Sequence, residues 1–284
     1  MGLVRTLLDR GHGDGASALP GALQDLYDGD LQFGATPAGR PYVIANFVST
    51  LDGIASYQIE GQSSGSAISG SNRADRFIMG LLRASADAII IGARTAQDVS
   101  AKSLWTPESV YPDAKDLYSD FRVNTLHKPA DPLLVVVSGS GRLELERAIF
   151  HTPAMRTVVI TSTPGKDELM RRGVAALSSV EVRALNVSGG GIDPKAILQL
   201  LQSQFAAKMV LHEGGPTLFG QFLTAGVGDE LFLTLSPQIA GRGVDGTRPG
   251  IVEGARFLPD SSPRFETVSV KESGGFLYLR YRRV

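Results

Sequence analysis

Apolar runs alternate with amphipathic stretches along most of the chain from residue 41 onward. Near-continuous apolar runs are typical of strands buried on both faces of a parallel sheet, whereas apolar residues three and four positions apart indicate helices. This pattern predicts strands over 42–48, 88–91, 133–137, 158–161 and 208–213. It predicts helices from residue 69 or 71 to about 84, from 194 to about 205, and over 217–225.

The pattern changes after Gly228. The three remaining strand-like runs, 230–236, 265–271 and 276–283, have no helical stretch between them, and a Ser-Gly-Gly turn separates the last two. We therefore predict an α/β protein with three layers (α/β/α), whose mostly parallel sheet finishes with antiparallel C-terminal strands.

Two stretches lack a regular pattern. Residues 1–40 are rich in Gly, Ala and Asp, and we expect them to form an extension outside the main fold, with a short helix near 22–27. Residues 53–70 are too rich in Ser and Gly for a regular element. The predicted organisation is an extension over 1–40 and one domain over 41–284.

Composition narrows the functional classes. The 284 residues include no cysteine, which excludes disulfides, thiolate catalysis and thiolate metal sites. A net charge of -1 gives no general reason to expect nucleic acid or an acidic membrane as a partner. No apolar run reaches the roughly 20 residues of a membrane span, so we expect a cytoplasmic protein. The four histidines have no metal-ligand spacing, and we predict no metal site.

Three predicted strand ends carry unusual residues: Asn46 with the 49–53 turn, Gly92–Thr95, and Glu213–Thr217. Ligands of open α/β sheets bind beyond the carboxyl ends of the strands. A glycine there lets the backbone approach a ligand, the following helix presents free N–H groups to an anion, and Arg94 adds a permanent charge suited to phosphate. The alternative, that these glycines only form turns and Arg94 is an ordinary surface residue, stays open from spacing alone.

Other candidates at strand ends are weaker or ambiguous. Ser138-Gly139-Ser140-Gly141 lacks the third glycine of a Rossmann fingerprint, although Ser138 could still contact a ligand. Asp52 is as consistent with closing a turn at Gly53 as with catalysis. Glu213 has no obvious packing role between an apolar strand and a Gly-Gly turn, which favours a functional one.

These motifs resemble those of a known family, the reductase domain of the bifunctional riboflavin-biosynthesis deaminase/reductase and its stand-alone archaeal and fungal counterparts. Residues 46–53 (NFVSTLDG) resemble its opening strand and turn. The segments 83–92, containing RA and DAIIIG, and 213–218 (EGGPTL), followed by DEL at 229–231, match its later blocks. The resemblance covers about residues 41–243.

The resemblance implies a dihydrofolate-reductase-like fold that binds NADPH across the sheet. It implies cofactor contacts from Asn46, Gly92, Arg94, Thr95, Asp98, Ser138, Gly214, Gly215, Pro216, Thr217, Leu218, Phe219 and Gly220. It also implies substrate contacts from Ser69, Arg83 and Glu213, and a cis peptide bond between Gly214 and Gly215.

The implied reaction is hydride transfer from NADPH to C1′ of a ribosylamino-pyrimidine 5′-phosphate. Asp52 or Glu213 would be the catalytic carboxylate that positions or protonates the substrate. The resemblance further implies a homodimer that covers the edge left by the antiparallel strands. The partners expected are therefore a small phosphorylated molecule and a second copy of the chain, with no nucleic acid and no membrane.

The sequence departs from the family pattern in three places. It lacks the cysteines of the deaminase zinc site, so only the reductase half is present. Ala67 replaces a tryptophan. The family's D-D-P-x-L-T-x-R stretch, whose arginine helps to hold the substrate phosphate, is absent from 96–105, and Lys102 is a possible replacement. Two alternatives remain: an NADPH-dependent reductase of another pterin-like substrate such as dihydrofolate, and an inactive nucleotide-binding paralogue.

Overall fold

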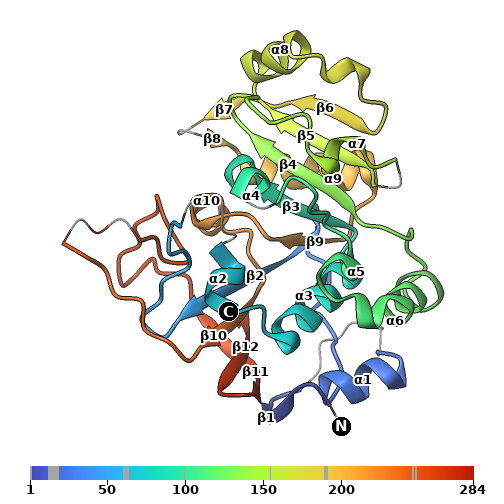
Figure 1. The fold of residues 1–284 in the computed structure, drawn as a ribbon. Coiled ribbons are helices and arrows are strands. Elements are labelled where there is room, and N and C mark those ends of the chain that lie inside the picture. The colour runs from blue at the N-terminus through green and yellow to red at the C-terminus, as the bar shows by residue number, and fades with distance from the viewer. Residues whose placement is uncertain are drawn as a thin grey trace.

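A ten-stranded mixed sheet organises the chain. The structure is a computed structural model, which describes residues 2–11, 19–59, 64–98, 100–153, 155–188, 191–244, 246 and 248–284. Helices cover both faces of the sheet, so the predicted three-layer α/β/α class is confirmed (Figure 1).

The sheet order is β1-β11-β12-β10-β2-β9-β3-β4-β5-β6. The strands from β10 to β6 are all parallel: β10 (Glu230–Ser236), β2 (Tyr42–Thr50), β9 (Met209–His212), β3 (Ala88–Gly92), β4 (Leu133–Ser138), β5 (Thr157–Thr161) and β6 (Val180–Ala184). The other end is antiparallel: β12 (Phe276–Arg283), β11 (Phe265–Ser273) and β1 (Arg5–Asp9). A small separate hairpin joins β7 (Val187–Ser188) to β8 (Gly191–Ile192).

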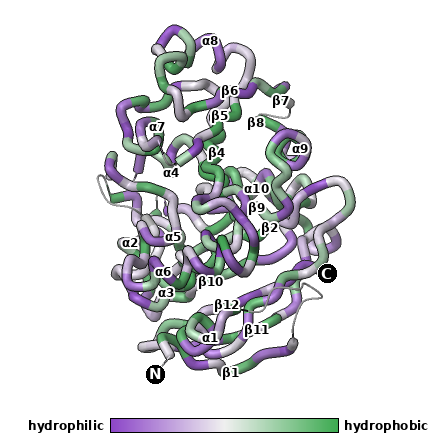
Figure 2. Tube along the Cα trace, turned by 90° about the vertical axis from the view of Figure 1, so that its right-hand side faces the viewer, coloured by the Kyte–Doolittle hydropathy of each residue, from purple (hydrophilic) through white to green (hydrophobic). Residues whose placement is uncertain are grey.

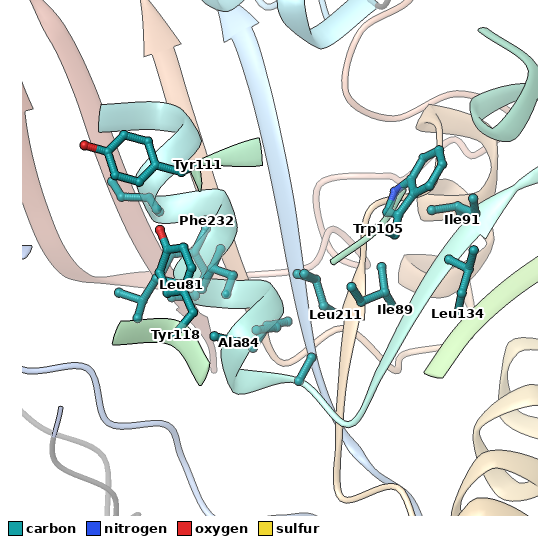
Figure 3. Packing of buried hydrophobic residues seen from close by; sticks show 14 of the residues in the cluster. Leu81, Ala84, Ile89, Ile91, Trp105, Tyr111, Tyr118, Leu134, Leu211 and Phe232 are labelled. Carbon is teal, nitrogen blue, oxygen red and sulfur yellow. The ribbon is translucent and has the colours of Figure 1, made fainter. Parts of the chain in front are cut away.

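Alternate residues of the central strands pack against different helices, as expected for strands buried on both faces. One face meets α1 (Gly21–Tyr27), α3 (Arg73–Ser85), α6 (Lys115–Asp120), α7 (Ala148–His151) and α8 (Thr163–Arg171). Figure 3 shows part of this core, where Trp105 lies beside Ile91 and Leu134. The opposite face meets α9 (Pro194–Phe205) and α10 (Pro216–Thr224). Hydrophobic colour accordingly follows β4 through the middle of the molecule in Figure 2.

The first forty residues, where they are described, are part of the main fold, contrary to the expected extension. β1 pairs antiparallel with β11 and becomes the edge strand of the sheet. The predicted short helix forms as α1, and its Leu23 and Tyr27 are buried in the core. A short polar segment gives no sequence signal for this, because the partner strand lies more than 250 residues away. The edge of β11 that we expected a second subunit to cover is therefore covered by the same chain.

The stretch predicted to lack regular structure contains one short helix, α2 (Ser64–Ser69), while residues 60–63 lie outside the described residues. The long helix α3 starts later than expected. Its N-cap is Asn72, whose side-chain oxygen accepts hydrogen bonds from the backbone N–H groups of Ala74 and Asp75. This cap sets the start of the helix that lines one wall of the cleft described below.

The chain between β3 and β4 carries the remaining short elements: α4 (Ala93–Asp98), α5 (Pro107–Val110), η1 (Pro112–Ala114) and the π-helical turn η2 (Phe121–Thr125). A further 3-10 turn, η3 (Val174–Ala176), precedes β6. No helix in the described part of the chain is long and apolar enough to cross a membrane.

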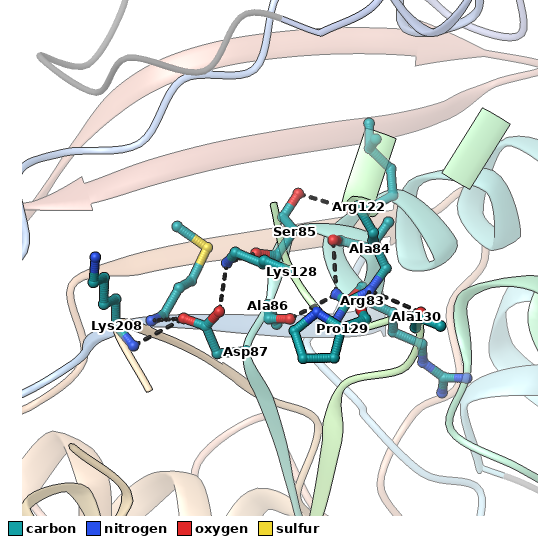
Figure 4. A network of polar contacts seen from close by, with 12 residues as sticks. Arg83, Ala84, Ser85, Ala86, Asp87, Arg122, Lys128, Pro129, Ala130 and Lys208 are labelled. Carbon is teal, nitrogen blue, oxygen red and sulfur yellow. Dashed lines mark hydrogen bonds and ion pairs between the residues drawn. The ribbon is translucent and has the colours of Figure 1, made fainter. Parts of the chain in front are cut away.

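A buried polar network fixes the C-terminal end of α3 (Figure 4). The Arg122 guanidinium is fully buried and donates to the backbone oxygens of Arg83, Ala84 and Ala86, at 3.2, 2.8 and 2.7 Å. It also reaches the backbone oxygens of Pro129 and Ala130. Because the last carbonyls of a helix lack the usual intrahelical donors, the arginine supplies hydrogen bonds to them and holds the end of α3 in place.

Candidate active site

A cleft of about 1730 Å³ opens at the carboxyl ends of β2, β3 and β9. Ligand pockets usually measure about 300–1,000 Å³, so this cleft has room for two ligands side by side. It brings together most of the residues selected from the sequence: Asn46, Ser69, Arg83, Gly92, Arg94, Thr95, Asp98, Glu213, Gly214, Gly215, Pro216, Thr217 and Leu218. The three strand ends identified in the sequence therefore meet at one site.

One half of the cleft is built by α4 and the start of α10. Gly215 is the N-cap of α10, and no side chain caps this end, so the first N–H groups of a nine-residue helix remain available at the cleft. A Cβ at Gly214 would lie 2.8 Å from Leu218 Cδ2, so a side chain here would require the leucine side chain to shift. Arg94 and Thr95 lie on α4, across from this turn. A positive helix end beside an arginine is suited to bind phosphate groups.

The peptide bond between Gly214 and Gly215 is trans, so the prediction of a cis bond, which the resemblance implied, is wrong for this chain. Gly215 has an extended backbone, with φ −68° and ψ 170°, which is the usual geometry of a residue just before a helix. This conformation turns the chain into α10 without a cis bond.

The other half of the cleft contains a buried ion pair between Arg83 on α3 and Glu213 after β9. Arg83 Nη2 lies 2.7 Å from Glu213 Oε2, and Nε lies 3.0 Å from Oε1. The two side chains are 6% and 8% exposed. Arg83 Nη1 also donates to the backbone oxygens of Leu104 and Thr106 and to the Ser109 hydroxyl, at 3.4, 3.3 and 3.1 Å. The pair therefore joins α3, β9 and the 104–109 segment into one wall.

Four of the selected residues do not line the cleft. Asp52 is exposed, and its carboxylate accepts hydrogen bonds from the Thr50 hydroxyl and from the N–H groups of Ala240 and Gly241. These bonds, the one from Thr50 first, lower the pKa of Asp52 to about 2. Between the two roles left open by the sequence, the geometry favours closing the turn.

The other three serve packing. Ser138 Oγ accepts from the N–H of Gly141 and closes the turn after β4. Phe219 is buried beside Phe47, with ring centroids 4.8 Å apart. At Gly220, a Cβ would come within 2.3 Å of the Glu253 backbone oxygen, so close packing and not a ligand accounts for this glycine.

His212 points away from Glu213, as the alternation of a strand predicts. It is fully buried beside Phe222, with ring centroids 4.8 Å apart, and neither ring nitrogen has a hydrogen-bond partner. Burial lowers the pKa of His212 to about 3, so the ring is neutral. It therefore serves as a packing residue.

Sequence reasoning missed Asp75, a carboxyl group in the wall of the cleft. It lies in the first turn of α3 and is only 5% exposed. Burial raises the pKa of Asp75 to about 6, although hydrogen bonds from the side chains of Thr234 and Ser69 oppose the rise. An acidic residue three positions after a helix cap is common, so nothing in the sequence distinguishes it from an ordinary exposed one.

Arg76 is a second residue of the cleft that was not selected from the sequence. It follows Asp75 on α3 and lines the same half of the cleft. Its guanidinium donates to the Ser71 hydroxyl at 3.0 Å, and no ion pair of Arg76 is present among the described residues. Lys102, the replacement cation suggested by the sequence, is exposed and does not line the cleft.

The fold and the site thus define an α/β protein with a large ligand cleft at the carboxyl ends of its parallel strands. The model of the RibD C-terminal domain matches residues 41–275. The chain therefore belongs to the family of RibD C-terminal domains.

Individual relatives agree with this assignment. The chain is 30% identical over 185 residues to the riboflavin biosynthesis protein RibD of Chlamydia trachomatis, an alignment that covers 65% of this chain and 42% of that protein. The structure is similar to RibD of Acinetobacter baumannii, with a TM-score of 0.64 and 23% identity over 87% of this chain and 59% of that one. It is similar at the same TM-score to a pyrimidine reductase-like protein of Corynebacterium diphtheriae, with 22% identity over 86% of this chain and 92% of that one. The chain thus spans less than two thirds of either RibD protein.

Proposed function

We propose that the protein is an NADPH-dependent reductase that transfers a hydride to C1′ of a ribosylamino-pyrimidine 5′-phosphate, as in riboflavin biosynthesis, without deaminase activity. The observation that carries this proposal is the cleft of about 1730 Å³, which has a helix start without a side-chain cap in one half and a buried ion pair in the other. Membership of the RibD C-terminal domain family supports it. The 284 residues contain no cysteine for the zinc site of the deaminase.

The α4–α10 half suits the cofactor. NADPH, when bound, supplies the hydride that reduces the substrate carbon. The uncapped N–H groups of α10 and the Arg94 guanidinium would hold its phosphates, with Thr95 and Asp98 beside them. The protein itself contributes binding, orientation and exclusion of water.

The substrate phosphate needs a cation, and we assign this role to Arg76. Arg83 is neutralised by Glu213, and its Nη1 is engaged by the 104–109 segment. Arg76 lines the same half of the cleft without a carboxylate partner in the described residues. Its planar guanidinium is suited to bidentate contact with a phosphate monoester. It would replace the arginine that is absent from 96–105.

A homodimer, which the family resemblance implies, is part of this proposal. Because β1 covers the edge of β11, the contact would form through another surface. Sedimentation equilibrium of the full chain would measure the assembly state.

The test is NADPH oxidation, followed by absorbance, with ribosylamino-pyrimidine 5′-phosphates and with dihydrofolate in parallel. Turnover with the phosphorylated pyrimidine is the expected result. Turnover with dihydrofolate alone would instead support a pterin reductase. Tight NADPH binding without turnover on either substrate would contradict the proposal and indicate an inactive nucleotide-binding paralogue.

A further inference from the structure

Reduction of the open-chain substrate needs a proton as well as a hydride. When a hydride adds to the carbon of a C=N bond, the π electron pair moves to nitrogen, which must then be protonated. Neither carboxylate selected from the sequence is placed to donate it. Asp52 lies outside the cleft with its oxygens engaged, and both oxygens of Glu213 accept hydrogen bonds from Arg83.

Asp75 is another carboxyl group, and it lies in the cleft wall beside the Arg83–Glu213 pair on the same helix as Arg83. Its backbone N–H donates to Asn72 Oδ1 at 3.1 Å, and the Tyr278 hydroxyl donates to the same oxygen at 2.9 Å. The side-chain hydroxyls of Ser69 on α2 and Thr234 on β10 are its hydrogen-bond partners. Two elements besides its own helix, α2 and β10, thus contact the carboxyl group of Asp75, a residue that is 5% exposed and lines the cleft.

The charged and titratable groups facing Asp75 have opposing effects on it. Glu213, at the end of β9, disfavours its ionisation, whereas Arg76 on its own helix favours it. Tyr278, from β12, stays neutral because burial raises its own pKa. Arg83, eight residues further along α3, is already paired with Glu213. Burial outweighs the hydrogen bonds and the Arg76 charge that favour the carboxylate, and it raises the pKa of Asp75 to about 6. A general acid is most effective when its pKa lies near the working pH.

We propose that Asp75 is the proton donor of the reductase, an inference that rests on the proposed function. As the hydride of the reduced nicotinamide adds to C1′, a C–H bond forms and the C=N π bond breaks. The nitrogen takes the proton from the Asp75 carboxyl, forming the N–H bond of the ribitylamino product. The carbon is reduced and the cofactor is oxidised. The Ser69 and Thr234 hydroxyls stabilise the carboxylate that remains, and water at the cleft returns the proton.

The test compares wild type with Asp75→Asn and Thr234→Val, by kcat against pH and by infrared difference spectra of the carboxyl band. In wild type, kcat should fall as the pH rises above about 6. Asp75→Asn should lower kcat about 100-fold, abolish this pH dependence and leave KM and NADPH affinity nearly unchanged. Thr234→Val removes a hydrogen bond to the carboxylate, so it should stay active and move the fall to higher pH.

The results distinguish failure of the proton-donor role of Asp75 from failure of the proposed reductase function. Asp75→Asn with wild-type kcat and pH profile would overturn the role of Asp75 while leaving the reductase function intact. A Thr234→Val profile identical to wild type would also overturn it. If wild type shows no turnover with any pyrimidine phosphate, the proposed function fails. The infrared measurement needs no turnover and then tests the protonation of Asp75. A carboxyl group that is ionised throughout pH 5–8 would contradict the inference, whereas one that loses its proton near pH 6 would support it.

Discussion

Removing the Arg83 guanidinium should reveal how much the cleft wall depends on the buried ion pair. Arg83→Met keeps the length of the apolar stem but leaves Glu213, 8% exposed, without its partner. It also removes three hydrogen bonds that Arg83 donates to the 104–109 segment, where the Ser109 hydroxyl remains a donor to the backbone oxygens of Leu104 and Thr106. Breaking a buried pair in this way costs about 3–5 kcal/mol, because an uncompensated charge stays buried. We expect a loss of about 4 kcal/mol in the free energy of unfolding.

The assay is urea denaturation followed by the fluorescence of Trp105, the only tryptophan in the chain. Its ring is buried, with its centroid 5.8 Å from the Arg83 guanidinium carbon, so it reports on this wall directly. The matched control is the double variant Arg83→Met with Glu213→Leu, which removes both charges and should regain at least half of the loss. A loss below about 1 kcal/mol in the single variant would refute the reasoning, as it would mean that the pair is solvated like a surface pair.

Three further outcomes are expected. Burial raises the pKa of Asp75 from 3.8 to about 6, so the folded protein favours the protonated carboxyl. The contribution of this proton to the free energy of unfolding is complete below about pH 4 and is lost as the pH rises through 6. Asp75→Asn should therefore stabilise the protein by up to about 3 kcal/mol at pH 8 and not at pH 4 in urea denaturation, and an equal effect at both pH values would argue against this origin. Arg122→Met should cost at least about 3 kcal/mol in the same assay, because five backbone carbonyls, three of them in buried contacts, lose this donor; a cost near zero would mean that water replaces it. Arg76→Met should raise KM for the phosphorylated pyrimidine about 100-fold, with little effect on kcat or on the unphosphorylated substrate, and Lys102→Met, measured alongside, should change neither.

Local patterns in the sequence predicted most of the sheet and its layers. Uninterrupted apolar runs such as 133–137 form buried parallel strands because both of their faces are covered, which is a property of the run itself. Asp193 and Pro194 mark the start of α9 for the same local reason, since cap geometry involves only neighbouring residues. Residues from all three predicted strand ends line one cleft, because the carboxyl ends of parallel strands share one edge, although the 49–53 turn lies outside it.

Only the tertiary structure decided which of these side chains face a ligand and which face each other. The sequence gives no distance between Arg83 and Glu213, which are 130 residues apart and neutralise each other across two elements. Asp75 is buried beside Ser69 of α2 and Thr234 of β10, which are distant in the sequence or on other elements, and its raised pKa follows from that burial. Likewise, β1 completes the sheet through a strand more than 250 residues away. The sequence by itself determined the elements and the edge where the site lies, because these depend on short-range periodicity. Long-range packing determined the charge and proton state of each group, because desolvation and pairing depend on neighbours that the sequence does not identify.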